Sequence, residues 1–153
     1  MENEPRVDTP RVLRLESELH FRAPTERLFR ALTDPDEIVR WFPTTHGRDR
    51  VKRLVFEQRV GGVQYEDWGD GRGHLYGQVT EWDPPWRYAV RSRLHPGTVM
   101  DTLATIASTS DGATLHASRV IVGPISLGEE AAIRRHGDFA RFHDAIRSVV
   151  EDA

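Results

Sequence analysis

The sequence predicts an α+β domain in which a curved, seven-stranded antiparallel sheet surrounds a long C-terminal helix. The chain opens on a segment that alternates apolar and polar residues, as a half-buried strand does. Six more such segments follow after about residue 53, separated by short turns with no helical pattern between them, which is typical of antiparallel pairing. The chain closes on an amphipathic helical pattern. One apolar helix stripe cannot cover both faces of a flat sheet, so we expect the sheet to bend around the helix.

The first strand is predicted at Val12–Arg22, where Leu13, Leu15, Leu19 and Phe21 form one apolar face. Helical spacing then begins at Thr25 and continues to Leu32. Asp34 can cap a further helix, and Glu37 completes a capping box with it. We therefore expect two short helices joined at a kink, the second ending near Trp41 and Phe42.

The remaining strands are separated by glycine- and proline-rich turns such as Gly69-Asp70-Gly71 and His95-Pro96-Gly97. We predict these strands at Leu54–Gln58, Val63–Trp68, His74–Trp82, Arg87–Leu94, Val99–Ser108 and Thr114–Val122. Glycines at positions 61, 62 and 77 are candidate points of curvature. The apolar stripe of the last helix consists of Phe139, Phe142, Ile146, Val149 and Val150.

Composition favours a single cytoplasmic domain. The chain has 153 residues with 38% hydrophobic and 29% charged side chains, which fits neither a disordered nor a membrane protein. Residues 1–11 are acidic, contain proline and lack an apolar stretch, so we expect a disordered lead-in before one domain at 12–153. The absence of cysteine excludes disulfides and thiolate chemistry, and a net charge of −3 argues against nucleic acid as a partner. A monomer and a homodimer both remain open.

Four stretches carry a family resemblance. They are Ala23-Pro-Thr-Glu-Arg-Leu-Phe-Arg-Ala-Leu-Thr-Asp-Pro35 followed by Trp41-Phe42, Val60-Gly-Gly-Val-Gln-Tyr-Glu66, Gly77-Gln-Val-Thr-Glu-Trp-Asp-Pro-Pro85 with Arg87, and Asp111-Gly-Ala-Thr-Leu115. In this order they resemble the START-like, Bet v 1-like helix-grip superfamily, in the branch related to the activator of the Hsp90 ATPase. The stretches span nearly the whole chain, but they are structural motifs that specify a fold better than an activity.

The resemblance implies a cavity for an apolar or amphipathic small molecule between the sheet and the last helix. The chain departs from the family near its end. A Gly-Trp pair usually opens the last helix, whereas Gly137 is followed here by Asp138. The name of the branch also implies contact with a chaperone as an alternative role.

The sequence lacks the signatures of common catalytic sites. The stretch Gly69–Gly73 is followed by a strand pattern instead of a helix, so we interpret it as a hairpin turn and not as a phosphate-binding loop. No Gly-x-Ser-x-Gly elbow is present, and the histidines do not have the spacing of a metal site. We therefore expect no metal and no cofactor.

Two polar residues remain as candidates for the cavity. If Gln64, Glu66 and Trp68 share the concave face, Glu66 is a buried carboxylate that needs a partner such as His116. The alternative places Tyr65 inside and Glu66 in solvent. For the late strand, the family turn favours His116 pointing inward, whereas propensity favours Leu115.

The main hypothesis is a cavity that binds a small hydrophobic or aromatic molecule, lipid-like molecules included. The expected ligand-binding residues are Trp41, Glu66, Trp68, Val90, Met100, His116, Phe139 and Phe142. One alternative is a polyketide cyclase- or hydratase-like lyase that uses an acid or base in the same cavity. The other is a chaperone-interacting module, which requires an exposed apolar patch and a filled interior.

Overall fold

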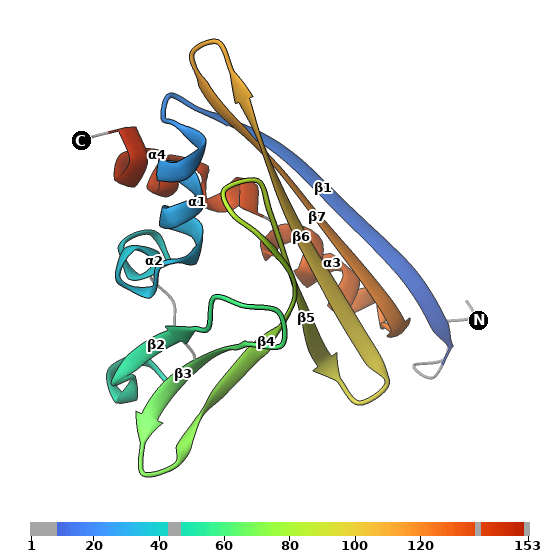
Figure 1. The fold of residues 1–153 in the computed structure, drawn as a ribbon. Coiled ribbons are helices and arrows are strands. Elements are labelled where there is room, and N and C mark those ends of the chain that lie inside the picture. The colour runs from blue at the N-terminus through green and yellow to red at the C-terminus, as the bar shows by residue number, and fades with distance from the viewer. Residues whose placement is uncertain (1–8, 43–46, 137–138, 152–153) are drawn as a thin grey trace.

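The seven strands form one antiparallel sheet (Figure 1). The computed structural model describes residues 9–42, 47–136 and 139–151. Its strands are β1 (Pro10–Phe21), β2 (Arg53–Phe56), β3 (Val63–Gly69), β4 (Arg72–Asp83), β5 (Arg87–His95), β6 (Thr98–Thr109) and β7 (Gly112–Pro124). The order across the sheet is β1-β7-β6-β5-β4-β3-β2, so only the β1–β7 pairing joins strands that are distant in the chain. The predicted sheet is confirmed, and β1 begins two residues earlier than expected.

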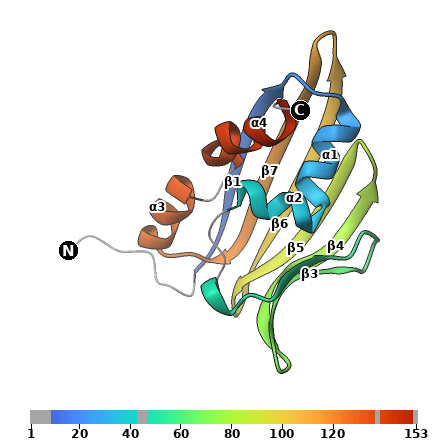
Figure 2. The ribbon, with the colours of Figure 1, turned by 90° about the vertical axis from the view of Figure 1, so that its left-hand side faces the viewer.

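All helices lie on one face of the sheet (Figure 2). They are α1 (Thr25–Thr33), α2 (Pro35–Trp41), α3 (Leu127–His136) and α4 (His143–Glu151), with the 3-10 turns η1 (Arg48–Arg50) and η2 (Phe139–Phe142). The kink between α1 and α2 is confirmed, because the Asp34 side chain accepts from the Asp36 amide at 2.9 Å and Pro35 opens α2. The C-terminal helical segment covers the sheet as predicted, but it is divided into α3, η2 and α4.

Curvature of the sheet is concentrated where β3, β4 and β5 meet. The register shifts between Gln64 and Tyr65 on β3, opposite Gly77 on β4. A Cβ atom at Gly77 would lie 2.6 Å from the Arg91 carbonyl oxygen and from Val90 Cγ1, so a larger residue cannot approach β5 this closely. The β2–β4 end of the sheet consequently bends towards α2 (Figure 1). Among the glycines expected at bends, Gly77 thus has a clear steric role.

The concave face of the sheet packs against the helices through one main hydrophobic cluster. Phe21, Leu28 and Leu115 are fully buried in it, together with Ile146 of α4. A second, smaller cluster lies under α3 and contains Leu13, Leu15, Ile121 and Ile125, with Met100 and Ile133 packed against it. No helix in the described ranges is long and apolar enough to cross a membrane.

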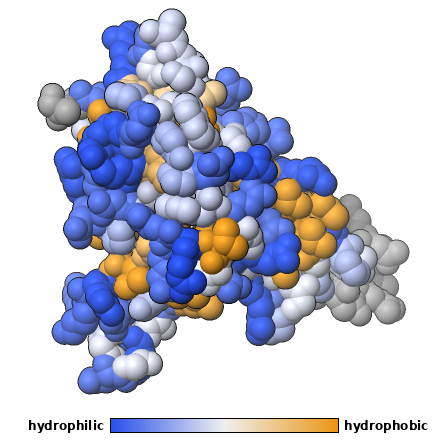
Figure 3. All heavy atoms as spheres, in the orientation of Figure 1, coloured by the Kyte–Doolittle hydropathy of each residue, from blue (hydrophilic) through white to orange (hydrophobic). Residues whose placement is uncertain are grey.

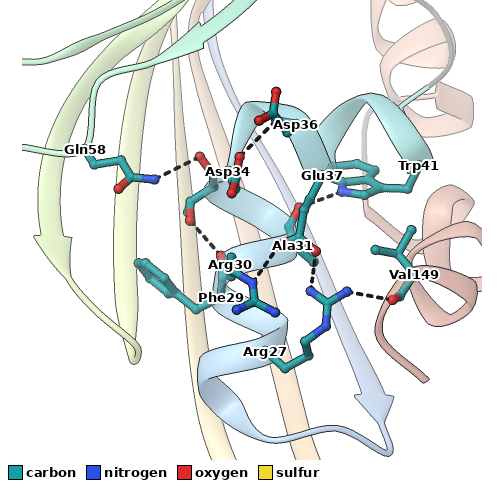
Figure 4. Close-up of polar contacts among 11 residues, drawn as sticks. Arg27, Phe29, Arg30, Ala31, Asp34, Asp36, Glu37, Trp41, Gln58 and Val149 are labelled. Carbon is teal, nitrogen blue, oxygen red and sulfur yellow. Dashed lines mark hydrogen bonds and ion pairs between the residues drawn. The ribbon is translucent and has the colours of Figure 1, made fainter. Parts of the chain in front are cut away.

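An ion pair of low exposure joins α1, α2 and α4 (Figure 4). Arg27 donates to Glu37 Oε1 at 2.5 Å and to the Val149 carbonyl oxygen at 2.8 Å. Glu37 also accepts from Arg30 at 3.0 Å, but the Arg30 side chain is 60% exposed whereas that of Arg27 is 17% exposed. Arg27 is therefore the arginine that holds α4 against the two short helices.

We expect Arg27→Met to lower the free energy of unfolding by about 2 kcal/mol, because it leaves Glu37 and the Val149 carbonyl with fewer donors in a site shielded from water. Arg30→Met removes a bond to the same carboxylate from an exposed position and should cost less than about 0.5 kcal/mol. Urea denaturation followed by circular dichroism measures both. Equal losses in the two variants would contradict this assignment.

Candidate functional site

A cavity of about 350 Å³ lies between the concave face of the sheet and the helices α2 and η2. Its helical wall is aromatic: Trp41, Phe42 and Phe142 contact one another edge to face, with ring centroids 5.5 to 6.0 Å apart. Phe139 extends this wall, with its centroid 6.3 Å from that of Trp41. Such rings provide a rigid apolar surface for a flat or chain-like ligand.

Trp41 is held in place by the helix that precedes it. Its indole Nε1 donates to the Ala31 carbonyl oxygen at 2.8 Å (Figure 4). Asp34 fixes the angle between the two helices by capping α2, so the capped kink directs Trp41 under the sheet. A motif that looked purely structural in the sequence thus positions one wall of the cavity.

The sheet wall follows the alternation of β5, β6 and β7. Tyr88, Val90 and Ser92 project inward from β5 and all line the cavity. On the adjacent β6, Thr102 lies opposite Val90 and Met100 lies opposite Ser92. On β7, Arg119 is paired in register with Thr102 of β6 and also lines the cavity.

Tyr88 and Arg119 are the polar groups of the inner wall with the clearest electrostatic coupling. Burial raises the pKa of Tyr88 well above its usual value, while the nearby positive charge of Arg119 acts in the opposite direction. The phenol therefore stays protonated at neutral pH and remains a hydrogen-bond donor. Arg119 places its Cζ atom 5.6 Å from the centroid of Phe139, within the range of a cation–π contact.

Glu66 is buried next to the cavity without lining it. Its Oε1 accepts from the Trp68 indole Nε1 at 2.8 Å and from the Gly47 amide, and its Oε2 accepts from the Tyr76 hydroxyl at 2.5 Å. The ring of Tyr76 lines the cavity and contacts Phe42, with centroids 6.2 Å apart. Glu66 thus positions Tyr76 and ties the segment at Gly47 to β3.

Five of the expected binding residues lie together on the cavity wall. These are Trp41, Val90, Met100, Phe139 and Phe142. Trp68 is not among the lining residues; its indole is turned to Glu66, and Arg50 covers its ring at 4.5 Å. The hypothesis that Glu66 is buried is correct, but its partners are Trp68, Tyr76 and Gly47 instead of His116.

The inward orientation expected for His116 is wrong. Leu115 and Ala117 are in the main hydrophobic cluster, so alternation along β7 places His116 on the convex face. Leu115 is fully buried. Its apolar character was therefore a better guide to which residues of β7 point inward than the resemblance of the preceding turn to the family pattern. His116, the partner that the sequence suggested for buried Glu66, therefore lies on the other side of the sheet from the cavity.

Sequence reasoning missed Phe42, Tyr76, Tyr88, Thr102 and Arg119. Tyr88 was within reach of the sequence, because Val90 was assigned inward and residues two apart on a strand share a face. The inward position of Arg119 can be predicted by the same alternation once Leu115 is assigned to the inner face of β7. Gly137 and Asp138, where the chain departs from the family motif, lie outside the described residues.

We expect Glu66→Ala to lower the free energy of unfolding by about 3 kcal/mol, because the Trp68, Tyr76 and Gly47 donors lose their shared acceptor inside the protein. Glu66→Gln retains one acceptor oxygen and the side-chain volume, so it should cost about half as much. Glu16→Ala, at an exposed position of β1, should change stability by less than about 0.5 kcal/mol. Urea denaturation followed by tryptophan fluorescence measures all three, and a loss for Glu66→Ala no larger than that for Glu16→Ala would refute this role.

Comparison with known proteins places the chain among relatives of the same fold. A structure from Rhizobium leguminosarum superposes with a TM-score of 0.70 at 23% identity, covering 95% of this chain and 98% of the other. A protein from Chromobacterium violaceum gives 0.64 at 25% identity, covering 92% and 98%, and an AHSA1-like protein from Aeromonas hydrophila gives 0.62 at 19%, covering 92% and 93%. None of the curated proteins compared with the chain matches it.

The family assignment comes from the sequence profile described as Activator of Hsp90 ATPase homolog 1-like protein, which matches residues 22–151. This range extends from the first residue after β1 to the end of α4, so it includes the aromatic wall and the sheet wall of the cavity. The chain belongs to the family of Activator of Hsp90 ATPase homolog 1-like proteins, with the helix-grip fold.

Proposed function

We propose that this protein is a cytoplasmic receptor that binds a small hydrophobic or aromatic molecule, without a cofactor, in the cavity between the sheet and α2 and η2. The observation that carries the proposal is the cavity itself. It has a volume of about 350 Å³ and adjoins the main hydrophobic cluster, with which it shares Trp41, Val90 and Phe139. A volume of this size is within the range of sites for small ligands.

The composition of the wall supports an apolar ligand. Trp41, Phe139 and Phe142 come from the helical side, and Val90 and Met100 come from the sheet. Burying about 200 Å² of apolar ligand surface contributes roughly 5 kcal/mol before the costs of association. The apolar wall supplies affinity, while the few polar groups orient the ligand.

Filling the cavity tests the proposal. Val90→Phe places a larger side chain on the inner wall, where Val90 is 6% exposed, and should weaken ligand binding at least tenfold. Val122→Phe makes the same substitution at an outward position that is 47% exposed and should leave binding unchanged. Native mass spectrometry against a panel of fatty acids and aromatic acids measures the bound fraction.

The thermal midpoint of both variants shows whether Val90→Phe is folded. Absence of binding by the wild-type protein across the panel, or equal binding by wild type and Val90→Phe, would overturn the proposal.

A second candidate is a role through the outer surface, as the name of the family suggests. Val12, Val99 and Val122 are register partners on β1, β6 and β7 and are 60%, 36% and 47% exposed. Figure 3 shows hydrophobic side chains gathered on this part of the sheet face. Three valines make a small patch compared with a stable protein interface. A role through this outer surface also leaves the cavity without a function.

The outer-surface role makes its own prediction. Val12→Lys combined with Val122→Lys should abolish capture of the protein by purified Hsp90 while leaving small-molecule binding intact. A pull-down of wild type and the double variant tests this. Failure of the wild-type protein to bind Hsp90 would remove this second candidate without affecting the cavity.

A further inference from the structure

The charged side chains that line the cavity are all basic. Arg119 and His74 contribute basic side chains to the wall, whereas Arg93 follows inward-pointing Ser92 on β5, so alternation points its side chain to the opposite face. No carboxylate is among the described lining residues, and Glu66 is separated from the space by Tyr76. This contrasts with the chain as a whole, whose net charge is −3. Arg119 therefore gives this part of the wall a positive charge that can attract an anionic group.

Arg119 interrupts an apolar row on the inner face of β7. Ala113, Leu115, Ala117 and Ile121 occupy the other inward positions and are buried. A charged residue within such a row costs desolvation energy that an aliphatic residue would avoid. Breaks in an otherwise consistent pattern are expected where function requires them. The position of Arg119 thus points to a role in recognition.

Two further side chains with hydrogen-bonding hydroxyl groups line the cavity on the neighbouring strands. Thr102, which is 8% exposed, is the register partner of Arg119 on β6. Tyr88 is 4% exposed on β5 and is close enough to Arg119 for the positive charge to affect the phenol. A guanidinium, a phenol and a hydroxyl therefore line one region of the cavity, and a guanidinium presents two N–H groups in a geometry that matches a carboxylate.

The aromatic wall continues from this polar region. Arg119 lies over the Phe139 ring, and Phe139 is next to Trp41 and Phe142. A molecule whose negative end reached Arg119 would consequently place its body along these rings. The distribution of groups is amphipathic, with one charged end and one apolar side.

We propose that the ligand is a carboxylic acid with an aromatic or otherwise apolar body, and that Arg119 binds its carboxylate with the help of Thr102 and Tyr88. This inference rests on the proposed function, because it names the chemical class that the same cavity takes. Arg119 determines specificity, and the apolar wall supplies the part of the affinity that does not depend on charge.

The test compares two probes of nearly identical shape, 2-naphthoate and 2-naphthamide, by isothermal titration calorimetry at pH 7. We expect the wild-type protein to bind the carboxylate at least tenfold more tightly than the amide. Arg119→Met retains an unbranched apolar stem and removes the guanidinium, so the amide should bind nearly as before while the preference for the carboxylate disappears. Arg14→Met removes an exposed arginine of β1 that does not line the cavity, and it should retain the preference.

Arg119→Lys provides a second variant in case the methionine variant does not fold. It keeps the charge without the two-pronged geometry and should retain only part of the preference. Equal affinity of the wild-type protein for the two probes would overturn the inference but leave the proposed receptor function standing. A full preference that survives in Arg119→Met would also overturn it. Binding of neither probe, nor of any panel molecule, would count against the cavity as a binding site altogether.

Discussion

The capped kink between α1 and α2 is the constraint on which the cavity depends. Asp34 and Pro35 end one helix and begin the next, and the change of direction carries Trp41 beneath the sheet. The Trp41 indole bonds to the Ala31 carbonyl, which locks the side chain to the preceding helix instead of to the sheet. A straight helix would lie along the concave face and fill it. Because the turn is fixed locally, the space between Trp41 and the inner strands is maintained without support from a ligand.

The two ends of the concave face are closed by different interactions. At one end, Phe21, Leu28 and Ile146 pack in the main cluster, and Arg27 joins α4 to the short helices. At the other end, buried polar contacts replace apolar packing, and Glu66 collects donors from β3, β4 and the segment at Gly47. Apolar burial supplies most of the stabilisation, whereas the polar cluster fixes the direction of Tyr76.

Local patterns in the sequence were sufficient for the architecture, because capping residues and strand alternation act over a few neighbouring positions. Local patterns were not sufficient to predict which residues of β7 point towards the helices. Leu115 and His116 are adjacent, and one residue of slip exchanges the two faces of a strand. Choosing His116 for the interior also hid Arg119, since both assignments depend on the same alternation. Glu66 was ambiguous for a related reason: its donors come from Trp68, Tyr76 and Gly47, and only folding brings Tyr76 and Gly47 to it.

Met100 connects the cavity to a part of the protein that does not line it. It contributes to the cavity wall and also packs against the second cluster, where Ile133 of α3 lies on Ile121 and its neighbours. Met is unbranched and adapts its shape at little cost, which suits a side chain that two packing regions share. The second cluster is smaller than the main one and separate from it, so α3 is packed on fewer buried residues than α1 and α4. The same side chain therefore belongs to the cavity wall and to the packing beneath α3, so a substitution at Met100 alters both at once.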